Sequence, residues 1–266
     1  MKLGFIGVGK MGSALLEGVL ASGACKPDEI AIHDVFQGAV DACVQKTGVV
    51  AAGSNAKVVE LSDAFVLCVK PHHALETLTE LTEIPVRDRL LISVVAGIQI
   101  ARLEEALDNR HRVIRVMPNT PALVGKGASA FAPGTHATSE DADLVRGILE
   151  AVGVAEQVTE PQLDAVTGLS GSGPAYVFSI IEAMADGGVL EGLPRATALR
   201  LAAQTVAGAA ELVQQTGEHP ATLRDNVASP GGTTIAGIAA FEKAGLRSAL
   251  IEAVRAAAQR SRELGD

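Results

Sequence analysis

The residues best suited to chemistry lie late in the chain, in a turn rich in glycine and hydroxyl groups at positions 229–234. The turn reads Ser-Pro-Gly-Gly-Thr-Thr and separates two stretches with helical patterns. Pro230 disfavours helix, the two glycines let a ligand approach the backbone, and Thr233 and Thr234 begin the next helix. The first N–H groups of a helix lack partners inside it and attract anions. The turn is therefore a candidate site for a small carboxylate, although ordinary helix capping explains the same residues.

A second candidate site opens the chain, where a short apolar run leads into Gly7-Val8-Gly9-Lys10-Met11-Gly12 and then into a helical pattern. This is G-x-G-x-x-G between a strand and a helix, the arrangement that binds the pyrophosphate of a dinucleotide. Gly7 makes the tight turn, Gly9 admits the pyrophosphate to the backbone, and Gly12 lets the helix pack closely on the strand. We therefore expect a dinucleotide cofactor.

Asp34 closes the next apolar run, about 20 residues after the last glycine of this motif. An acidic residue at that place binds the adenosine ribose 2′-hydroxyl in dinucleotide folds. No Lys or Arg follows before Lys46, so this segment taken alone favours NADH over NADPH. The alternative interpretation of Asp34 is a solvated residue that caps the end of a strand.

Three further segments follow predicted strands, and ligands of open parallel sheets bind at the carboxyl ends of strands. The segments are Val69-Lys70-Pro71, Val95-Ala96-Gly97 and Met117-Pro118-Asn119-Thr120-Pro121. Within them, we expect the cofactor to contact Val69, Lys70, Pro71, Ala96, Gly97, Met117, Asn119 and Thr120. The rigid loop between the last two prolines would place an amide and a hydroxyl beside a nicotinamide. Alternatively, the prolines only end the strands and begin loops, and Lys70 is a solvated loop residue.

The first half of the chain alternates apolar runs with amphipathic stretches, the pattern of a parallel sheet with crossover helices. The predicted strands are 3–8, 30–33, 64–69, 90–95 and 113–117, and the predicted helices are 11–21, 72–81 and 138–152, the last capped by Thr138 or Ser139. After about residue 165 the sequence shows long alanine-rich helices and no convincing strand. We predict an α/β fold, with a doubly wound Rossmann domain over 1–163 and an all-helical domain over 164–266.

The helix expected over 174–190 is apolar on most sides, with only Glu182 and Asp186 charged in its body. Such a helix needs burial on more than one face, which indicates a subunit interface. We therefore expect a homo-oligomer whose active site is shared between two subunits.

Composition excludes several classes of protein. The chain has 266 residues, is 48% hydrophobic and carries a formal net charge of −9 without a basic run, which disfavours nucleic acid and acidic membranes as partners. The cysteines Cys25, Cys43 and Cys68 are odd in number and not closely spaced, so we expect small core residues in a cytoplasmic protein. We expect neither a membrane span nor a metal site.

The second half of the chain is poor in residues that move protons. Positions 127–242 contain no lysine, positions 137–218 contain no histidine, and Tyr176 is the only tyrosine. A ketone or alcohol dehydrogenase needs such a group, whereas the nitrogen of a C=N bond is already basic. The composition therefore favours imine reduction. His219 and Tyr176 are alternative acids, but a histidine at a helix start and a core aromatic explain them as well.

Five segments, in order and spacing, resemble the pyrroline-5-carboxylate reductase family: 5–12, 69–71, 115–121, 168–176 and 220–242. The resemblance covers nearly the whole chain. It implies a Rossmann domain followed by a helical dimerisation domain, with dimers often assembled into decamers. It also implies reduction of the cyclic imine 1-pyrroline-5-carboxylate to L-proline by NADPH or NADH, the last step of proline biosynthesis.

The same resemblance assigns roles to the late turn. Ser229 and the backbone of Gly231, Gly232, Thr233 and Thr234 resemble the family's carboxylate-binding turn, and the Thr234 hydroxyl resembles its partner for the ring nitrogen. Many members carry small polar or basic residues after the second strand, from which Asp34-Val35-Phe36-Gln37 departs.

Two other functions fit parts of the pattern. A β-hydroxyacid dehydrogenase would need a catalytic lysine after the Rossmann domain, where this chain has a long lysine-free stretch. A non-enzymatic dinucleotide-sensing regulator would need the glycine motif but not the late turn.

Overall fold

The computed structural model describes residues 2–265, and the chain packs into two compact units. One unit comprises the chain up to Ser172 together with the segment from Ala256, and the other comprises Gly173–Arg255.

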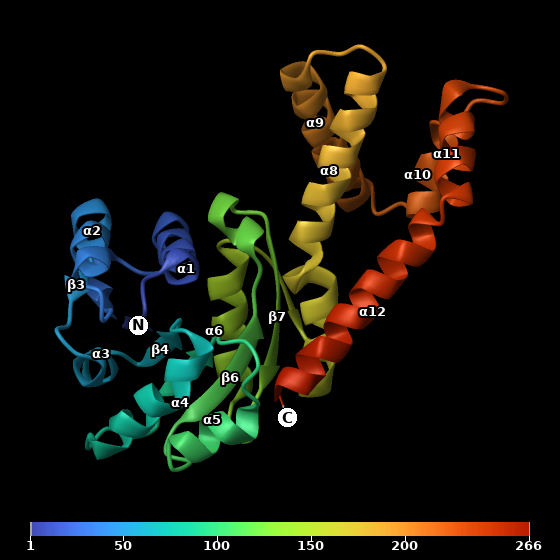
Figure 1. Cartoon of the computed structure of the whole chain (residues 1–266). Helices are drawn as coiled ribbons and strands as arrows, with labels where there is room; N and C mark the ends of the chain where they lie inside the picture. The colour runs from blue at the N-terminus through green and yellow to red at the C-terminus, as the bar shows by residue number, and fades with distance from the viewer. Residues whose placement is uncertain (1, 266) are drawn as a thin grey trace. The chain divides into compact units, whose positions relative to one another are not determined.

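Within the described residues, the first unit holds one sheet of eight strands in the order β3-β2-β1-β4-β5-β6-β7-β8 (Figure 1). The strands are β1 (Leu3–Ile6), β2 (Ile30–His33), β3 (Val50–Ala51), β4 (Ala64–Leu67), β5 (Leu90–Ser93), β6 (Arg112–Met117), β7 (Gly127–Pro133) and β8 (Gly153–Gln157). β1 to β6 run parallel, β7 runs antiparallel to β6, and β8 pairs parallel with β7. The five predicted strands and the α/β class are confirmed. The carboxyl ends of the parallel strands consequently share one edge of the sheet.

Three strands were not predicted, and each has a weak local signal. β3 has only two residues, β7 reads Gly-Ala-Ser-Ala-Phe-Ala-Pro, and β8 is mostly exposed. Small residues and a terminal proline resemble a loop when they are considered alone. Pairing with β6 makes β7 a strand, and β8 then extends the sheet from β7.

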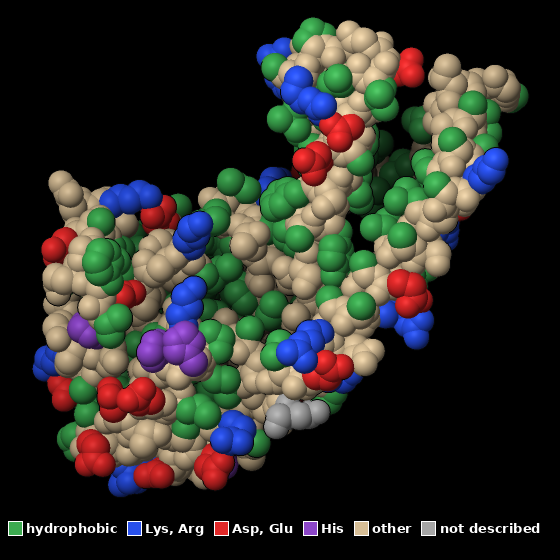
Figure 2. Space-filling model, viewed as in Figure 1, with side chains coloured by type: hydrophobic (Ala, Val, Ile, Leu, Met, Phe, Trp, Pro, Cys, Tyr) green, Lys and Arg blue, Asp and Glu red, His purple; other side chains and the backbone are tan. Residues whose placement is uncertain are grey.

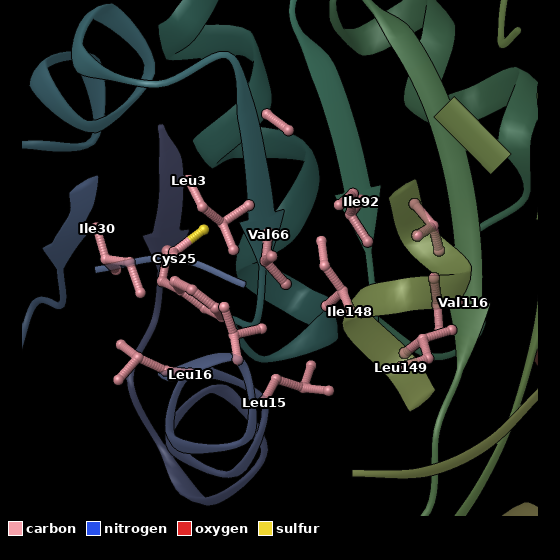
Figure 3. Close-up of a cluster of buried hydrophobic side chains, with 14 of the residues drawn as sticks. Leu3, Leu15, Leu16, Cys25, Ile30, Val66, Ile92, Val116, Ile148 and Leu149 are labelled. Carbon is pink, nitrogen blue, oxygen red and sulfur yellow. The ribbon is translucent and has the colours of Figure 1, made fainter. Parts of the chain in front are cut away.

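Helices cover both faces of the sheet. One face is covered by α1 (Lys10–Ala21), α2 (Gln37–Thr47) and α6 (Ser139–Glu150), and the other by α3 (Asn55–Leu61), α4 (Pro71–Glu80) and α5 (Ile100–Ala106). In Figure 3, Leu15 and Leu16 of α1 and Ile148 and Leu149 of α6 lie in one cluster with Val66 of the sheet. Burial of this aliphatic surface is the main stabilising term for the unit.

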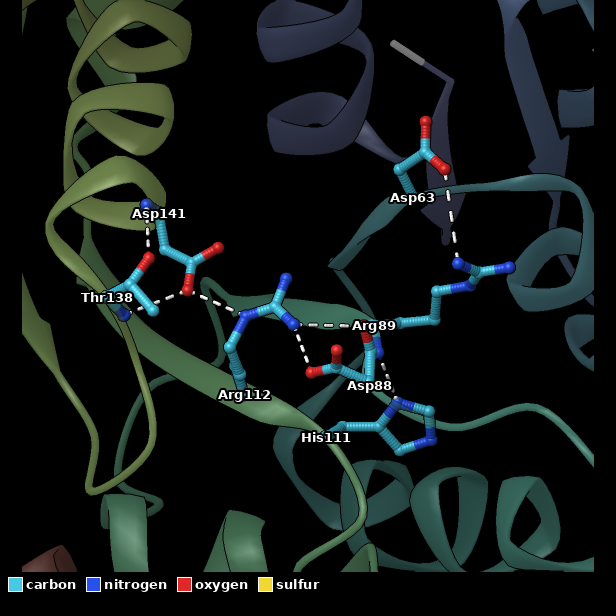
Figure 4. Close-up of polar contacts among 7 residues, drawn as sticks. All are labelled: Asp63, Asp88, Arg89, His111, Arg112, Thr138 and Asp141. Atoms are coloured by element: carbon cyan, nitrogen blue, oxygen red, sulfur yellow. Dashed lines mark hydrogen bonds and ion pairs between the residues drawn. The ribbon is translucent and has the colours of Figure 1, made fainter.

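A polar network joins the start of α6 to the start of β6 (Figure 4). Thr138 caps the helix as predicted, since its hydroxyl accepts from the Asp141 N–H at 3.2 Å. Arg112, at the start of β6, donates to Asp141 at 2.7 Å and also pairs with Asp88. Burial alone would raise the pKa of Asp141, but hydrogen bonds from Arg112 and Thr138 outweigh it and hold the pKa below its usual value.

The second unit is helical, as predicted, and contains α8 (Gly173–Leu190), α9 (Arg195–Thr216), α10 (Pro220–Asn226), α11 (Thr233–Lys243) and the first half of α12 (Leu246–Gly265). α8 and α9 pack together around Ala185, Ala198 and Ala202. Many larger apolar side chains stay exposed, and Figure 2 shows hydrophobic side chains along α8, α11 and α12. Examples are Phe178, Met184, Ile235, Phe241 and Ile251. Among residues 2–265, no helix combines the length and the hydrophobicity needed to cross a bilayer.

The division predicted at residue 163 stays a prediction about domains, and the packing units differ from it in two respects. The first unit continues to Ser172, because Val166 of α7 (Leu163–Val166) packs against the core of the sheet and the Ser170 carbonyl accepts from the Asn119 side chain at 3.0 Å. The end of α12 also belongs to the first unit, where the Ser261 hydroxyl donates to Asp164 at 2.6 Å. Neither contact is local in sequence.

Candidate active site

The glycine motif forms the turn between β1 and α1, and two of its three glycines are required by close contacts within the fold. Gly7 has φ +94°, and a Cβ there would lie 2.7 Å from the Cys68 carbonyl oxygen. A Cβ on Gly12 would lie 2.3 Å from the Gly7 carbonyl oxygen, so only glycine allows this contact. A Cβ on Gly9 would meet no atom within 4 Å. The structure therefore leaves open space beside Gly9, which fits the pyrophosphate of a dinucleotide.

α1 begins directly after Gly9 and has no side-chain cap. Its first N–H groups are therefore available to an anion, and the positive end of the helix dipole adds to the attraction. Lys10 is exposed at this end, and Val8 and Gly12 are buried. A hydrogen bond from the Ser13 hydroxyl to the Val8 carbonyl, at 2.8 Å, stabilises the loop.

Asp34 lies at the end of β2 and reaches across to the glycine motif. Its Oδ2 accepts a hydrogen bond from the Val8 N–H at 2.8 Å, and its Oδ1 accepts from the Phe36 N–H at 2.9 Å. The sequence showed that these segments share a sheet edge but did not reveal this bond. Asp34 is thus half-buried and attached to the loop that precedes α1.

The segment after β4 lies beside the glycine motif. Lys70 is the exposed N-cap residue of α4 and Pro71 is the first residue of that helix, while Val69 is half-buried. Burial raises the pKa of the preceding Cys68 thiol to about 12, so this side chain is neutral at physiological pH. The thiol contributes bulk and no charge beside the glycine turn.

Asn119 has its side chain inside the fold. It is 7% exposed; its Nδ2 donates to the Ser170 carbonyl at 3.0 Å, and its Oδ1 accepts from the Ala128 N–H at 2.9 Å. The amide expected beside a nicotinamide is therefore buried and hydrogen-bonded to the protein through both its nitrogen and its oxygen. Thr120, by contrast, is exposed.

A cavity of about 200 Å³ lies at the carboxyl ends of β5 and β6 in the first unit. Ala96, Gly97 and Met117, all predicted cofactor residues, contribute to its wall. Further parts of the wall come from the end of α12, from Thr167 of a π-helix, η5 (Thr167–Gly171), and from Ser172 just after it. A Cβ on Gly171 would lie 2.5 Å from the Met117 Cε, so the glycine makes room for this methionine. π-helices are rare and often mark functional sites.

Arg115 lines the same cavity and was not predicted. Its side chain is buried, and its Nη1 donates to Glu160 Oε1 at 3.0 Å. The same carboxylate oxygen accepts from the Ile100 N–H at 2.6 Å. The available signal was a charged residue inside the apolar strand Val-Ile-Arg-Val-Met, because buried arginines need a partner.

The late turn lies in the helical unit and has the predicted form. α10 ends at Asn226 and α11 begins at Thr233. Gly231 has φ +67°, and the Gly232 N–H donates to the Ser229 carbonyl at 3.0 Å. Gly232 is the N-cap and offers no side chain, so the first N–H groups of α11 have no side-chain acceptor. Ser229 and Thr233 are exposed and Thr234 is half-buried.

The two alternative acids have structural contacts in the helical unit. His219 is the N-cap of α10, and its Nδ1 accepts from the Ala221 N–H at 3.2 Å. The Tyr176 hydroxyl donates to the Ala253 carbonyl at 3.3 Å. His219 therefore matches its helix-start alternative, whereas Tyr176 is half-buried in α8 and is not a core residue. Cys25 and Cys43 lie in the core as expected, and among residues 2–265 no three His, Cys, Asp or Glu side chains gather as a metal site.

The fold brings the predicted cofactor residues together. From Gly7 to Thr120 they lie in one unit, at or just beyond the carboxyl ends of adjacent strands. The predicted substrate residues, Ser229 to Thr234, form one turn in the other unit.

Comparison with known proteins identifies the family. A family profile described as pyrroline-5-carboxylate reductase dimerisation matches residues 160–264, and one described as NADP oxidoreductase, coenzyme F420-dependent, matches residues 2–97. The chain is 49% identical over 264 residues to a pyrroline-5-carboxylate reductase of Methanosarcina acetivorans, covering 99% of this chain and 98% of the relative.

Two solved structures agree. A pyrroline-5-carboxylate reductase from Coxiella burnetii is 34% identical, with a TM-score of 0.95 over 100% of this chain and 98% of that one. A Plasmodium falciparum pyrroline carboxylate reductase with NADP bound is 33% identical, with a TM-score of 0.87 over 100% of this chain and 98% of that one. With its sheet edge, its late turn and these relatives, the chain belongs to the pyrroline-5-carboxylate reductase family.

Proposed function

We propose that this protein reduces the cyclic imine 1-pyrroline-5-carboxylate to L-proline with hydride from NADH or NADPH, the last step of proline biosynthesis. One observation carries the proposal: the chain contains two separate helix starts that lack a side-chain cap and suit anions. The same chain matches a reductase over almost its full length. One helix start suits the pyrophosphate of a coenzyme and the other suits the carboxylate of an imino acid.

The coenzyme would be held along the edge of the sheet. The backbone of Gly7 to Gly12 would bind the pyrophosphate, and Asp34 would bind the adenosine ribose. Val69, Lys70, Pro71, Ala96, Gly97, Met117, Thr120 and the backbone of Asn119 would contact the remainder. When bound, the reduced nicotinamide supplies the hydride.

The substrate carboxylate would be held at the start of α11. Gly231 and Gly232 carry no side chains that block access to the N–H groups of Thr233 and Thr234, and the Ser229 hydroxyl adds a further donor. The helix dipole favours the negative charge of the ligand. Local binding of this kind is needed because the chain as a whole is acidic.

Thr234 would position the ring nitrogen through its hydroxyl. An imine nitrogen takes up a proton from water more readily than a ketone oxygen does, so the protein needs to orient it rather than supply a strong acid. The long lysine-free stretch and the structural contacts of Tyr176 and His219 agree with this assignment. They disfavour a hydroxyacid dehydrogenase, which needs a catalytic lysine.

The chain carries the dimerisation region of its family. We propose that dimers assemble further, to a decamer, and that the enzyme acts in the cytoplasm. The exposed apolar residues of α8, α9 and α11 supply surface for subunit contacts.

The test is an assay of the purified chain with racemic pyrroline-5-carboxylate, in which oxidation of NADH and NADPH is followed by absorbance and L-proline is measured. We expect stoichiometric proline formation with at least one coenzyme. Coenzyme binding without any proline would favour the dinucleotide-sensing regulator, and turnover of β-hydroxy acids instead would favour the rival dehydrogenase.

A further inference from the structure

Asp34 is fixed by hydrogen bonds at both of its carboxylate oxygens. The Val8 N–H donates to Oδ2 at 2.8 Å, and the Phe36 N–H donates to Oδ1 at 2.9 Å. Val8 lies in the glycine motif and Phe36 lies in the loop after β2, so the carboxylate joins these two segments. A side chain held at both ends keeps one position before any ligand arrives, and its charge is therefore preorganised.

The two hydrogen bonds leave capacity for a ligand. Each carboxylate oxygen has two lone-pair sites, and each uses one of them for the backbone. The hydroxyls of a ribose donate hydrogen bonds to such oxygens, and hydrogen bonds to charged acceptors are the stronger kind. A 2′-phosphate at the same place brings negative charge and mainly acceptor oxygens, so a carboxylate repels it.

The segment that follows Asp34 supplies no cation that would offset this repulsion. Positions 35–45 contain neither Lys nor Arg. The next basic residue, Lys46, pairs with Glu17, and Lys57 in α3 pairs with Glu60 at 2.9 Å. A 2′-phosphate would therefore face a fixed carboxylate, with no positive partner from the segment that follows it.

The two residues that follow Asp34 are apolar. Val35 is 95% exposed and Phe36 is 70% exposed, both directly after the carboxylate. Such surface suits the flat face of an adenine, which both coenzymes carry, and offers nothing to a phosphate. Lys10 stands at the start of α1, where it is placed for the pyrophosphate that both coenzymes also share.

We propose that Asp34 is the residue that determines coenzyme specificity in this reductase, and that it selects NADH over NADPH. The inference rests on the proposed function for its physiological meaning. The related Plasmodium falciparum reductase was solved with NADP bound, so the preference would separate this chain from that relative. Asp34 acts by accepting hydrogen bonds from the ribose and by repelling a 2′-phosphate.

The experiment measures Kd for NADH and for NADPH by nicotinamide fluorescence without imine, and then kcat/KM for each coenzyme with imine. We expect the native chain to bind NADH roughly tenfold more tightly than NADPH or better. Asp34→Ser removes the charge and should weaken NADH binding and strengthen NADPH binding, shifting the ratio of the two Kd values by roughly 30-fold. Asp34→Asn keeps the shape and one acceptor and should shift the ratio in the same direction.

The matched control is Asp41→Asn, which removes an equal charge from the exposed face of α2, where Asp41 accepts from Gln37. Its ratio should stay at the native value. Tighter binding of NADPH by the native chain would overturn the proposal. An equal loss of affinity for NADH and NADPH in Asp34→Ser and Asp34→Asn would also overturn it, because Asp34 would then only support the loop that contains Val8. Because binding is read without imine, failure of the proposed reaction would leave this result separately interpretable.

Discussion

The sheet-containing unit and the helical unit of this chain differ in how they bury apolar surface. The first has two extensive cores, one on each face of its sheet, whereas the second buries only three alanines among its hydrophobic residues. The first unit can therefore position the predicted coenzyme-binding residues, at the carboxyl ends of its strands, by its own packing. The second needs a cover for its exposed side chains, which agrees with the dimerisation profile that matches this part of the chain.

A charge placed on the apolar surface of each unit tests which of the two surfaces needs a cover. Phe178 on α8 is 63% exposed, and Phe36 in the first unit is similarly exposed. We expect Phe178→Glu to weaken dimerisation by roughly a thousandfold, because a buried, unpaired charge opposes association. Analytical ultracentrifugation measures the effect. Phe36→Glu is the matched control and should stay dimeric.

The monomer made by Phe178→Glu also tests whether two subunits share one active site. It should still bind coenzyme, because the first unit has its own core, but should lose imine reduction. A monomer with native kcat would contradict the shared site. An unchanged dimer would contradict the assignment of α8 to the interface.

The next effect in size concerns the turn of the helical unit. Thr234→Ala removes the hydroxyl assigned to the ring nitrogen and should lower kcat roughly 100-fold, with little change in coenzyme Kd. Steady-state kinetics and coenzyme fluorescence together give both values. Thr234→Ser keeps a hydroxyl and should retain most of the native kcat. Thr233→Ala, which changes the exposed neighbour, should lower kcat less than Thr234→Ala does. Native kcat and KM in Thr234→Ala would remove Thr234 from the mechanism.

A smaller effect separates packing from binding in the glycine motif. Gly12→Ala places a methyl group 2.3 Å from the Gly7 carbonyl oxygen, so it should cost about 1–3 kcal/mol of stability and weaken coenzyme binding roughly tenfold. Gly9→Ala adds the same methyl group to open space and should weaken binding without changing stability. Thermal unfolding and coenzyme titration distinguish the two. Equal stability losses would show that the space beside Gly9 is not open.

The smallest effect is a pH dependence confined to the sheet-containing unit. His111 is buried, its Nδ1 accepts from the Arg89 N–H at 3.1 Å, and its ring meets Phe65 edge-on. Burial lowers the pKa of His111 below its ordinary value of 6.5. The unfolded chain therefore takes up the proton first as pH falls, so stability is highest above 6.5 and declines below it.

Urea unfolding from pH 7.5 down to 5 should show this decline, and His111→Asn should flatten it. The exposed His219 in the helical unit provides the control, and His219→Asn should leave the slope unchanged. The carboxylate of Asp141 does not affect the slope in this range, because its folded pKa lies below 3.8: its stabilisation is fully present above 3.8 and is lost only as pH falls through the folded pKa. A slope that survives in His111→Asn would assign the effect to another group.

Local patterns predicted the elements whose signal is local. The five central strands are continuous apolar runs, the G-x-G-x-x-G turn has its strand and helix on either side, and Thr138 precedes a polar first turn. The start of α11 at Thr233 was likewise visible from the proline and glycines before it. β7 was not predicted, because its small residues form a strand only when β6 pairs with them.

The parallel sheet, the glycine turn and the helical second half could be predicted from local sequence, because backbone sterics and hydrophobic periodicity act over neighbouring residues. The roles of the polar side chains, in contrast, depend on tertiary contacts. The tertiary structure attached Asp34 to Val8, withdrew the Asn119 amide into the fold and paired Arg115 with Glu160. These partners are far apart in sequence, and a buried polar group bonds to whatever group the packing brings within reach.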